Sequence, residues 1–136
     1  MTTPTMPDVV RALRTLAAAN TGVAELAGDA MFARKLPEGA EPPLVLIPPA
    51  LSNPGAPPTH QWWDVVATFD LHAVTVDEAN ELLTAVLAFV PTIPGGHDDV
   101  VVSDCQVEAI QELYDDAWTP PRHRYVVTVA LTAREP

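Results

Sequence analysis

The side chains that carry most enzymatic chemistry are sparse in this 136-residue chain. The single cysteine, Cys105, lies between Asp104 and Glu108, and neighbouring negative charge raises the pKa of a thiol instead of activating it. The two serines, Ser52 and Ser103, do not stand in the G-x-S-x-G pattern of a hydrolase nucleophile elbow. These residues do not predict an enzyme.

Metal and phosphate chemistry are equally poorly represented. The glycine pair in IPGGHDD is not followed by the Lys-Ser or Lys-Thr of a phosphate loop. The acidic pairs Asp98-Asp99 and Asp115-Asp116 could bind a hard cation, but adjacent carboxylates point apart in an extended chain. The histidines lie in different predicted elements without zinc-motif spacing: His60, His72, His97 and His123. We therefore expect neither a metal nor a cofactor.

Aromatic and cationic side chains suggest a protein interface instead. Adjacent residues of a strand face opposite ways, so if Trp63 lies in the core, Trp62 lies outside and needs a cover. That cover is either a loop of the same chain or a neighbouring subunit. Arg122 and Arg124 share one strand face and could pair with carboxylates of the same or an adjacent copy. The candidate interface residues are Trp62, Tyr114, Trp118, Arg122, Arg124, Pro57 and Pro58.

Charge is distributed unevenly along the chain. No Lys or Arg occurs from Leu36 to Pro121, although that segment holds 14 of the 18 acidic residues. With a net charge of -11, most of the surface must be electronegative. Such a surface repels phosphate groups and anionic headgroups, so the sequence disfavours a protein that grips nucleic acid or a membrane.

Composition predicts one globular domain over residues 1–136. Hydrophobic residues make up 48% of the chain, which is too many for a disordered protein. A lone cysteine cannot form an internal disulfide, and no signal peptide or apolar span of about 20 residues is visible. We expect synthesis and folding in the cytoplasm.

Hydrophobic periodicity predicts the elements that position these residues. Helices are expected at about Met6–Ala19, with Thr5 and Asp8 as a capping box, and at about Val76–Val90, with Thr75 and Glu78 as another. Between them lies a proline-rich segment, residues 48–61, predicted to be a long loop. The predicted strands are AMFARKL, PLVLI, HQWWDVVATFDLHAV, VVVSDCQVEAIQELY with a bulge or turn near Glu108, and RYVVTVALTAR.

This order predicts an α+β fold. We expect a mostly antiparallel sheet of about four to five strands, with two helices packed on one face to cover its apolar side. The other face of the sheet would carry mixed polar side chains.

Pattern and order together resemble the tail terminator family of long-tailed bacteriophages, which includes tail-completion and minor tail proteins of the neck. The carrying segments are VVRALRTLAAANTGVAELAG leading into MFARKLPEG and PPLVLI, the unit HQWWDVVATFDLHAVTVDEANELLTAV, and the closing RHRYVVTVALTA. The resemblance covers most of the chain.

The resemblance implies a structural virion protein, not an enzyme. Six copies would form a ring that caps the tail tube, ends tube polymerisation and joins the tail to the head connector. The implied partners are further copies of the chain, the tail tube protein and the connector, and DNA would pass through the lumen without specific binding. The protein would be assembled in the host cytoplasm and reside in the virion neck.

Two other classes remain open on the residues alone. An acidic inhibitor that mimics DNA would need carboxylates spaced like phosphates and a basic partner. A small ligand-binding domain would need a pocket between the sheet and the helices.

Overall fold

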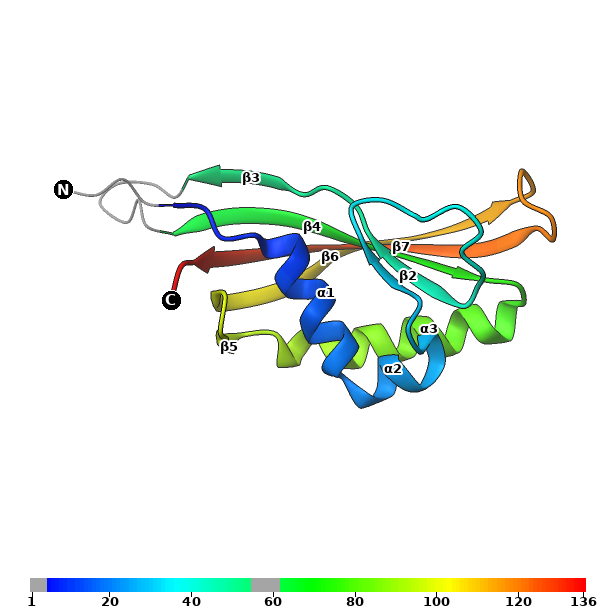
Figure 1. Cartoon of the computed structure of the whole chain (residues 1–136), viewed down its shortest axis with the longest axis horizontal. Coiled ribbons are helices and arrows are strands. Elements are labelled where there is room, and N and C mark those ends of the chain that lie inside the picture. Colours follow the sequence, from blue (N-terminus) through cyan, green and yellow to red (C-terminus); the bar gives the residue numbers. More distant parts are fainter. Residues whose placement is uncertain (1–4, 55–61) are drawn as a thin grey trace.

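The structure is a computed structural model that describes residues 5–54 and 62–136. The chain folds in the order α1 (Val9–Ala19), α2 (Thr21–Ala27), β1 (Met31–Ala33), β2 (Leu44–Ile47), β3 (Leu51–Pro54), β4 (Trp63–Ala73), α3 (Val76–Phe89), the 3-10 turn η1 (Val90–Thr92), β5 (Gly95–Gly96), β6 (Val101–Asp115) and β7 (Arg122–Arg134). Figure 1 shows these elements along an elongated sheet.

The predicted α+β class is confirmed, but the sheet differs from the expected one in two respects. Across the described residues it has seven strands in the order β1-β2-β4-β7-β6-β5, with β3 paired to β4 beside β2. It is also mixed, because β1 and β2 run parallel while the other pairs are antiparallel. The expectation of four to five strands was too low because β3 and β5 are short and lie in segments that read as a proline-rich loop and a glycine turn.

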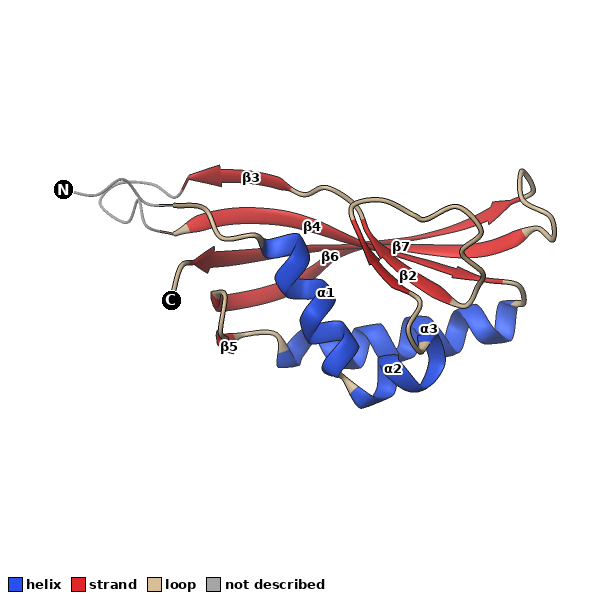
Figure 2. Ribbon diagram, viewed as in Figure 1, coloured by secondary structure: helices blue, strands red, loops and turns tan. Residues whose placement is uncertain are grey.

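All three α-helices lie on one face of the sheet (Figure 2), where two were expected. The additional helix is α2, which was not among the two predicted helices. Its N-cap is Asn20, whose side-chain oxygen accepts a hydrogen bond from the backbone of Val23 at 3.1 Å. This cap satisfies a backbone donor at the helix start and lets a seven-residue helix form against α3.

The capping residues confirm the predicted start of α3 and show that α1 begins later than predicted. In α3 the Thr75 hydroxyl accepts from the backbone of Glu78 at 3.1 Å, and the Glu78 carboxylate accepts from the backbone of Val74 at 3.3 Å. In α1 the cap is Asp8 instead of Thr5, because the Asp8 carboxylate accepts from the backbone of Arg11. The first helix therefore begins at Val9, three residues later than expected.

The core lies between the helices and the helix-facing side of β4 and β7. Phe69 of β4 and Phe89 of α3 meet edge to face with ring centroids 6.0 Å apart. Val127 and Val129 of β7 are completely buried beside them. Every second residue of these long strands enters this core, as the alternation in the sequence predicts.

Among the residues that the structure describes, no helix lies on the opposite face of the sheet (Figure 2). One end of this face is covered by the loop after β1 and by the β6–β7 turn (Figure 1). Within the described part of the chain, none of the helices is both long and apolar enough to span a membrane.

Candidate protein interface

Two acidic strands and one basic strand meet at the covered end of the helix-free face. The Arg124 guanidinium donates to Asp70 of β4 at 3.2 and 2.6 Å and to Asp115 of β6 at 3.1 Å. These three residues lie on three neighbouring strands, β4, β7 and β6, so the ion pairs tie the strands together across the sheet. The structure thus shows intramolecular pairing for Arg124.

Arg122 is held by a different set of contacts on the same face. Its guanidinium carbon lies 3.6 Å from the centre of the Trp118 ring, and one of its nitrogens donates to the carbonyl of Ala40 at 3.0 Å. The other terminal nitrogen lies 3.1 Å from His72 Nδ1. Arg122 is only 6% exposed, so it is a buried anchor that links the β6–β7 turn to the loop over β2.

The His72 tautomer follows from this geometry. A guanidinium only donates hydrogen bonds, so Nδ1 of His72 must accept and the ring hydrogen sits on Nε2. Nε2 lies 3.1 Å from Asp70 Oδ1 but does not form a hydrogen bond with it, and no other described residue accepts from Nε2. With one nitrogen occupied and the side chain 3% exposed, His72 is placed to support Arg122 and not to meet a substrate.

Electrostatics in this cluster favour the charged forms of its two carboxylates, Asp70 and Asp115. Burial raises the pKa of Asp70, but contacts with His72 and Arg124 outweigh burial and hold that pKa below its usual value. A hydrogen bond from the backbone of Ala117, supported by Trp118 and Arg124, lowers the pKa of Asp115. The Asp115 carboxylate also accepts from the indole nitrogen of Trp118 at 2.9 Å, so it orders the turn that presents Trp118.

The sequence-predicted interface residues do not form one patch. Trp118, Arg122 and Arg124 come together in this cluster, which also includes three residues that were not predicted as interface residues: Asp70, His72 and Asp115. The alternation along β4 is the signal that could have found Asp70 and His72 on the outer face, but it could not show that β7 supplies their partners. Trp118 remains 37% exposed and is the part of the cluster open to a partner.

The other predicted residues lie elsewhere. Trp62 precedes β4 at the opposite end of the sheet, and Arg134 covers its ring at 5.0 Å. Trp63 packs onto the core as expected, with its indole nitrogen buried and unpartnered among the described residues. Tyr114 is 63% exposed on the helix-facing side of β6, where it contacts the His123 ring. Pro57 and Pro58 lie outside the described residues.

Strand β6 offers a second candidate surface. Among the described residues, the outer edge of β6 pairs with β5 at Val101 and Val102 only. The rest of this edge, from Ser103 to Asp115, has no strand partner among them. Val107 and Ile110 lie opposite the buried Val129 and Val127 of β7, yet they are 38% and 45% exposed. The helical layer therefore ends over β7 and leaves an apolar shelf on β6.

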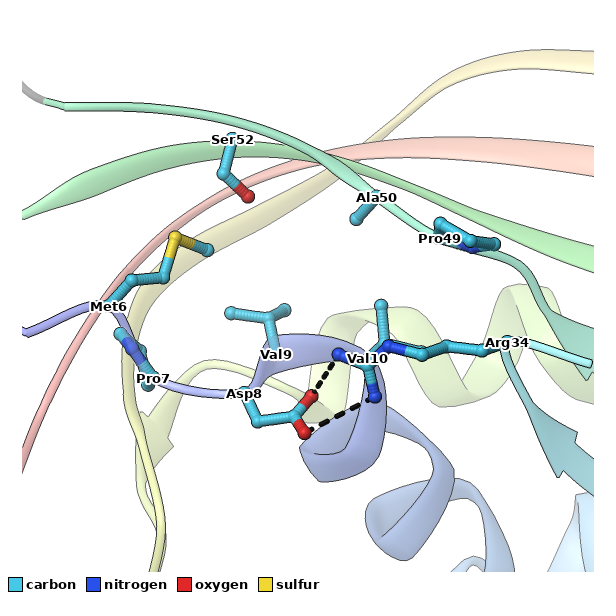
Figure 3. A pocket seen from close by; sticks show the side chains of 9 residues that line it. All are labelled: Met6, Pro7, Asp8, Val9, Val10, Arg34, Pro49, Ala50 and Ser52. Carbon is cyan, nitrogen blue, oxygen red and sulfur yellow. Dashed lines mark hydrogen bonds and ion pairs between the residues drawn. The ribbon is translucent and has the colours of Figure 1, made fainter.

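A hollow of about 370 Å³ lies between the start of α1 and β3 (Figure 3). Its two charged side chains, Asp8 and Arg34, pair with each other at 2.7 and 3.2 Å. The hydrogen bond from Arg34 also lowers the pKa of Asp8. Since these charges satisfy each other, the hollow shows no charged group directed at a ligand.

Residues 5–54 and 62–136 contain no group of three or more His, Cys, Asp or Glu side chains arranged to hold a metal ion. No protein-family model and no curated protein matches this chain.

Proposed function

We propose that this protein is a structural subunit of the bacteriophage neck, which forms a hexameric ring on the tail tube, ends tube polymerisation and joins the tail to the head connector. The tail tube protein and the connector are its partners in this proposal, and the assembled ring resides in the virion. The proposal starts from the resemblance of the sequence pattern to tail terminators, and three features of the structure support it.

The helix-free face of the sheet is the observation that carries the proposal. Its middle portion, on β4, β7 and β6, presents small, uncharged or acidic side chains: Asp64, Val66, Thr68, Thr128, Ala130, Thr132, Asp104 and Gln106. It holds a shallow hollow of about 280 Å³ and no cation between Arg124 and Arg134. A surface of this kind lets DNA pass without binding it, because there are no basic groups to replace the phosphate counterions.

The length of the strands also supports the proposal that the sheet forms part of a channel wall. β4, β6 and β7 contain 11, 15 and 13 residues, which at about 3.3 Å per residue gives ribbons of roughly 35 to 50 Å. Most of this length is uncovered on the helix-free side. Six such faces arranged around an axis would enclose an electronegative lumen, with the helices on the outside.

The open edge of β6 supports association between subunits. An unpaired edge with exposed apolar side chains is a liability for a protein that remains monomeric. A ring covers such an edge in every copy. The same edge has little use in a small ligand-binding domain.

The structure gives less support to the acidic inhibitor. A DNA mimic needs its carboxylates on one surface, whereas Asp104 pairs with Thr132 on the helix-free face and Glu112 pairs with Tyr125 on the helix-facing side. The acids of β6 therefore point to both sides of the sheet. Along one strand they are also several residues apart, which is wider than the phosphate spacing of about 3.4 Å per strand.

Negative-stain electron microscopy of the purified chain tests the proposal. We expect ring-shaped particles with a central opening and sixfold averages. A field of small monomeric particles at every protein concentration, or dimers without an opening, would contradict it.

A further inference from the structure

The two lateral edges of the sheet differ in the charged side chains that they carry. At the β6 edge, residues 98–116 include seven acids and no cation: Asp98, Asp99, Asp104, Glu108, Glu112, Asp115 and Asp116. At the β1 edge, the segment from Asp8 to Glu41 combines five acids with four of the seven cations. These four cations lie on α1 and just after β1: Arg11, Arg14, Arg34 and Lys35. We call this second group the basic flank.

The basic flank is exposed and fixed to the sheet edge. The side chains of Arg11, Arg14 and Lys35 are exposed, and Arg34 is half exposed beside its partner Asp8. Arg14 donates from Nε to the carbonyl of Met31 in β1 at 3.1 Å, which holds α1 against this edge. The strand order places β1 and β6 toward opposite sides of the sheet, so one copy cannot bring the two groups together.

We propose that the β6 edge of one copy docks against the basic flank of the next copy, an inference that rests on the proposed ring. Each subunit then offers the acidic β6 edge and the cation cluster of the basic flank, and every contact in the ring is the same joint between the two. The occupant of the β6 edge is thus a second copy of this chain.

The apolar shelf gives this joint its hydrophobic part. Val107, Ile110 and Tyr114 are exposed on the helix-facing side of β6, where the helical layer of their own subunit has ended. The helices of the next copy, which carry the basic flank, would continue that layer. Burial of exposed apolar area stabilises the contact, and the charges set which edges meet.

Symmetric pairing of two β6 edges is disfavoured by the same features. It would bring together two strands that each carry Asp104, Glu108 and Glu112, and like charges on adjacent strands repel. Register shifts at Val102/Asp104 and Val107/Ala109 also bend the edge away from regular strand addition. A head-to-tail contact is heterologous, and repeated heterologous contacts form a ring when the rotation between neighbouring copies closes.

A charge-swap experiment tests this joint. One variant, Glu108→Lys with Glu112→Lys, makes the β6 edge basic, and a second, Arg11→Glu with Lys35→Glu, makes the flank acidic. All four side chains are exposed, and circular dichroism with thermal melting would establish that each variant folds. Glu25→Lys with Glu81→Lys introduces the same change of net charge as the first variant, at exposed positions of α2 and α3, and serves as the control.

We expect both edge variants to be monomeric in native mass spectrometry, the control to assemble like the wild type, and an equimolar mixture of the two edge variants to regain a ring of alternating copies. Assembly of either edge variant on its own at the wild-type level would overturn the joint, as would a mixture of folded variants that stays monomeric.

The same measurements distinguish a failure of the proposed joint from a failure of the proposed function. If the wild type forms open chains or a ring of another size and the charge swap behaves as expected, the joint stands and the hexameric terminator is contradicted. If the wild type is a hexamer that neither variant disturbs, the terminator stands and the joint is wrong. A wild type that is monomeric at every concentration contradicts both.

Discussion

The guanidinium of Arg122 lies flat enough over the Trp118 ring for its central carbon to come within 3.6 Å of the ring centre. Strand β7 begins at Arg122, while Trp118 belongs to the turn that leaves β6, so this contact fixes the turn to the sheet. The edge-to-face contact of His72 with Trp118, at 6.2 Å between centroids, adds a third strand to the arrangement. The exposed remainder of Trp118 is therefore presented on a rigid support.

Replacement of Arg122 by Ala should destabilise the fold by about 2–3 kcal/mol, because it removes charge-assisted hydrogen bonds and the stacking on Trp118. Urea unfolding followed by tryptophan fluorescence measures this loss. The control is Arg134→Ala, which removes an arginine 5.0 Å from the Trp62 ring near the chain end and should cost under about 1 kcal/mol. Equal effects of the two substitutions would contradict the anchoring role of Arg122.

Acidification should weaken the fold through Asp70. The pKa of Asp70 is lower in the folded protein, so its contribution is complete above the unfolded carboxyl value of about 4 and is lost as the pH falls through the folded value. Asp115 and Asp8 act in the same direction. Urea midpoints measured across this acid range should fall steadily for the wild type and less steeply for Asp70→Asn.

The matched control for Asp70→Asn is Asp116→Asn, which removes an exposed carboxylate of the β6–β7 turn. It should leave the acid profile close to that of the wild type. A profile of Asp70→Asn that is superimposable on the wild type would show that Asp70 does not contribute.

Val129 and Val107 are cross-strand neighbours, and their truncation should affect different properties: the stability of the monomer for Val129 and the assembly of subunits for Val107. Val129 is fully buried, so Val129→Ala should lower the free energy of unfolding by about 1.5–3 kcal/mol. Val107 is 38% exposed on the shelf, so Val107→Ala should change that free energy by less than about 1 kcal/mol while weakening assembly. Denaturant unfolding and analytical ultracentrifugation read the two effects separately. A loss of monomer stability as large for Val107→Ala as for Val129→Ala would show that the helical layer extends over β6.

The thiol of Cys105 should be slow to alkylate in the folded protein. Burial, with a smaller contribution from Asp104, raises its pKa from 9.0 to about 11. Two pKa units reduce the thiolate fraction at mildly alkaline pH about 100-fold, and only the thiolate reacts. Iodoacetamide labelling with and without urea, followed by mass spectrometry, measures the ratio. Similar rates in the two conditions would contradict the burial of this residue.

Local signals in the sequence predicted the elements whose causes are local. The capping pair of Thr75 and Glu78 predicted the start of α3, and the alternation within HQWWDVVATFDLHAV predicted β4. The bulge expected near Glu108 is present between Val107 and Ala109. Each of these features is encoded within a few residues.

The features that the sequence did not reveal depend on distant partners. β3 forms only because Leu51–Pro54 lies beside β4, so its proline-rich surroundings indicated a loop. Arg124 and Asp70 are 54 positions apart, and Arg122 and His72 are 50 apart, so no spacing rule connects them. The limit of the helical layer over β7, which exposes Val107, is likewise a property of the packed structure.

Native mass spectrometry of the wild-type chain over a concentration series tests the central claim most directly. The account predicts a dominant hexamer at six times the 14.6 kDa chain mass, or about 88 kDa, that grows at the expense of the monomer as concentration rises. A strictly monomeric protein at every concentration, or a dimer as the largest species, would contradict the ring.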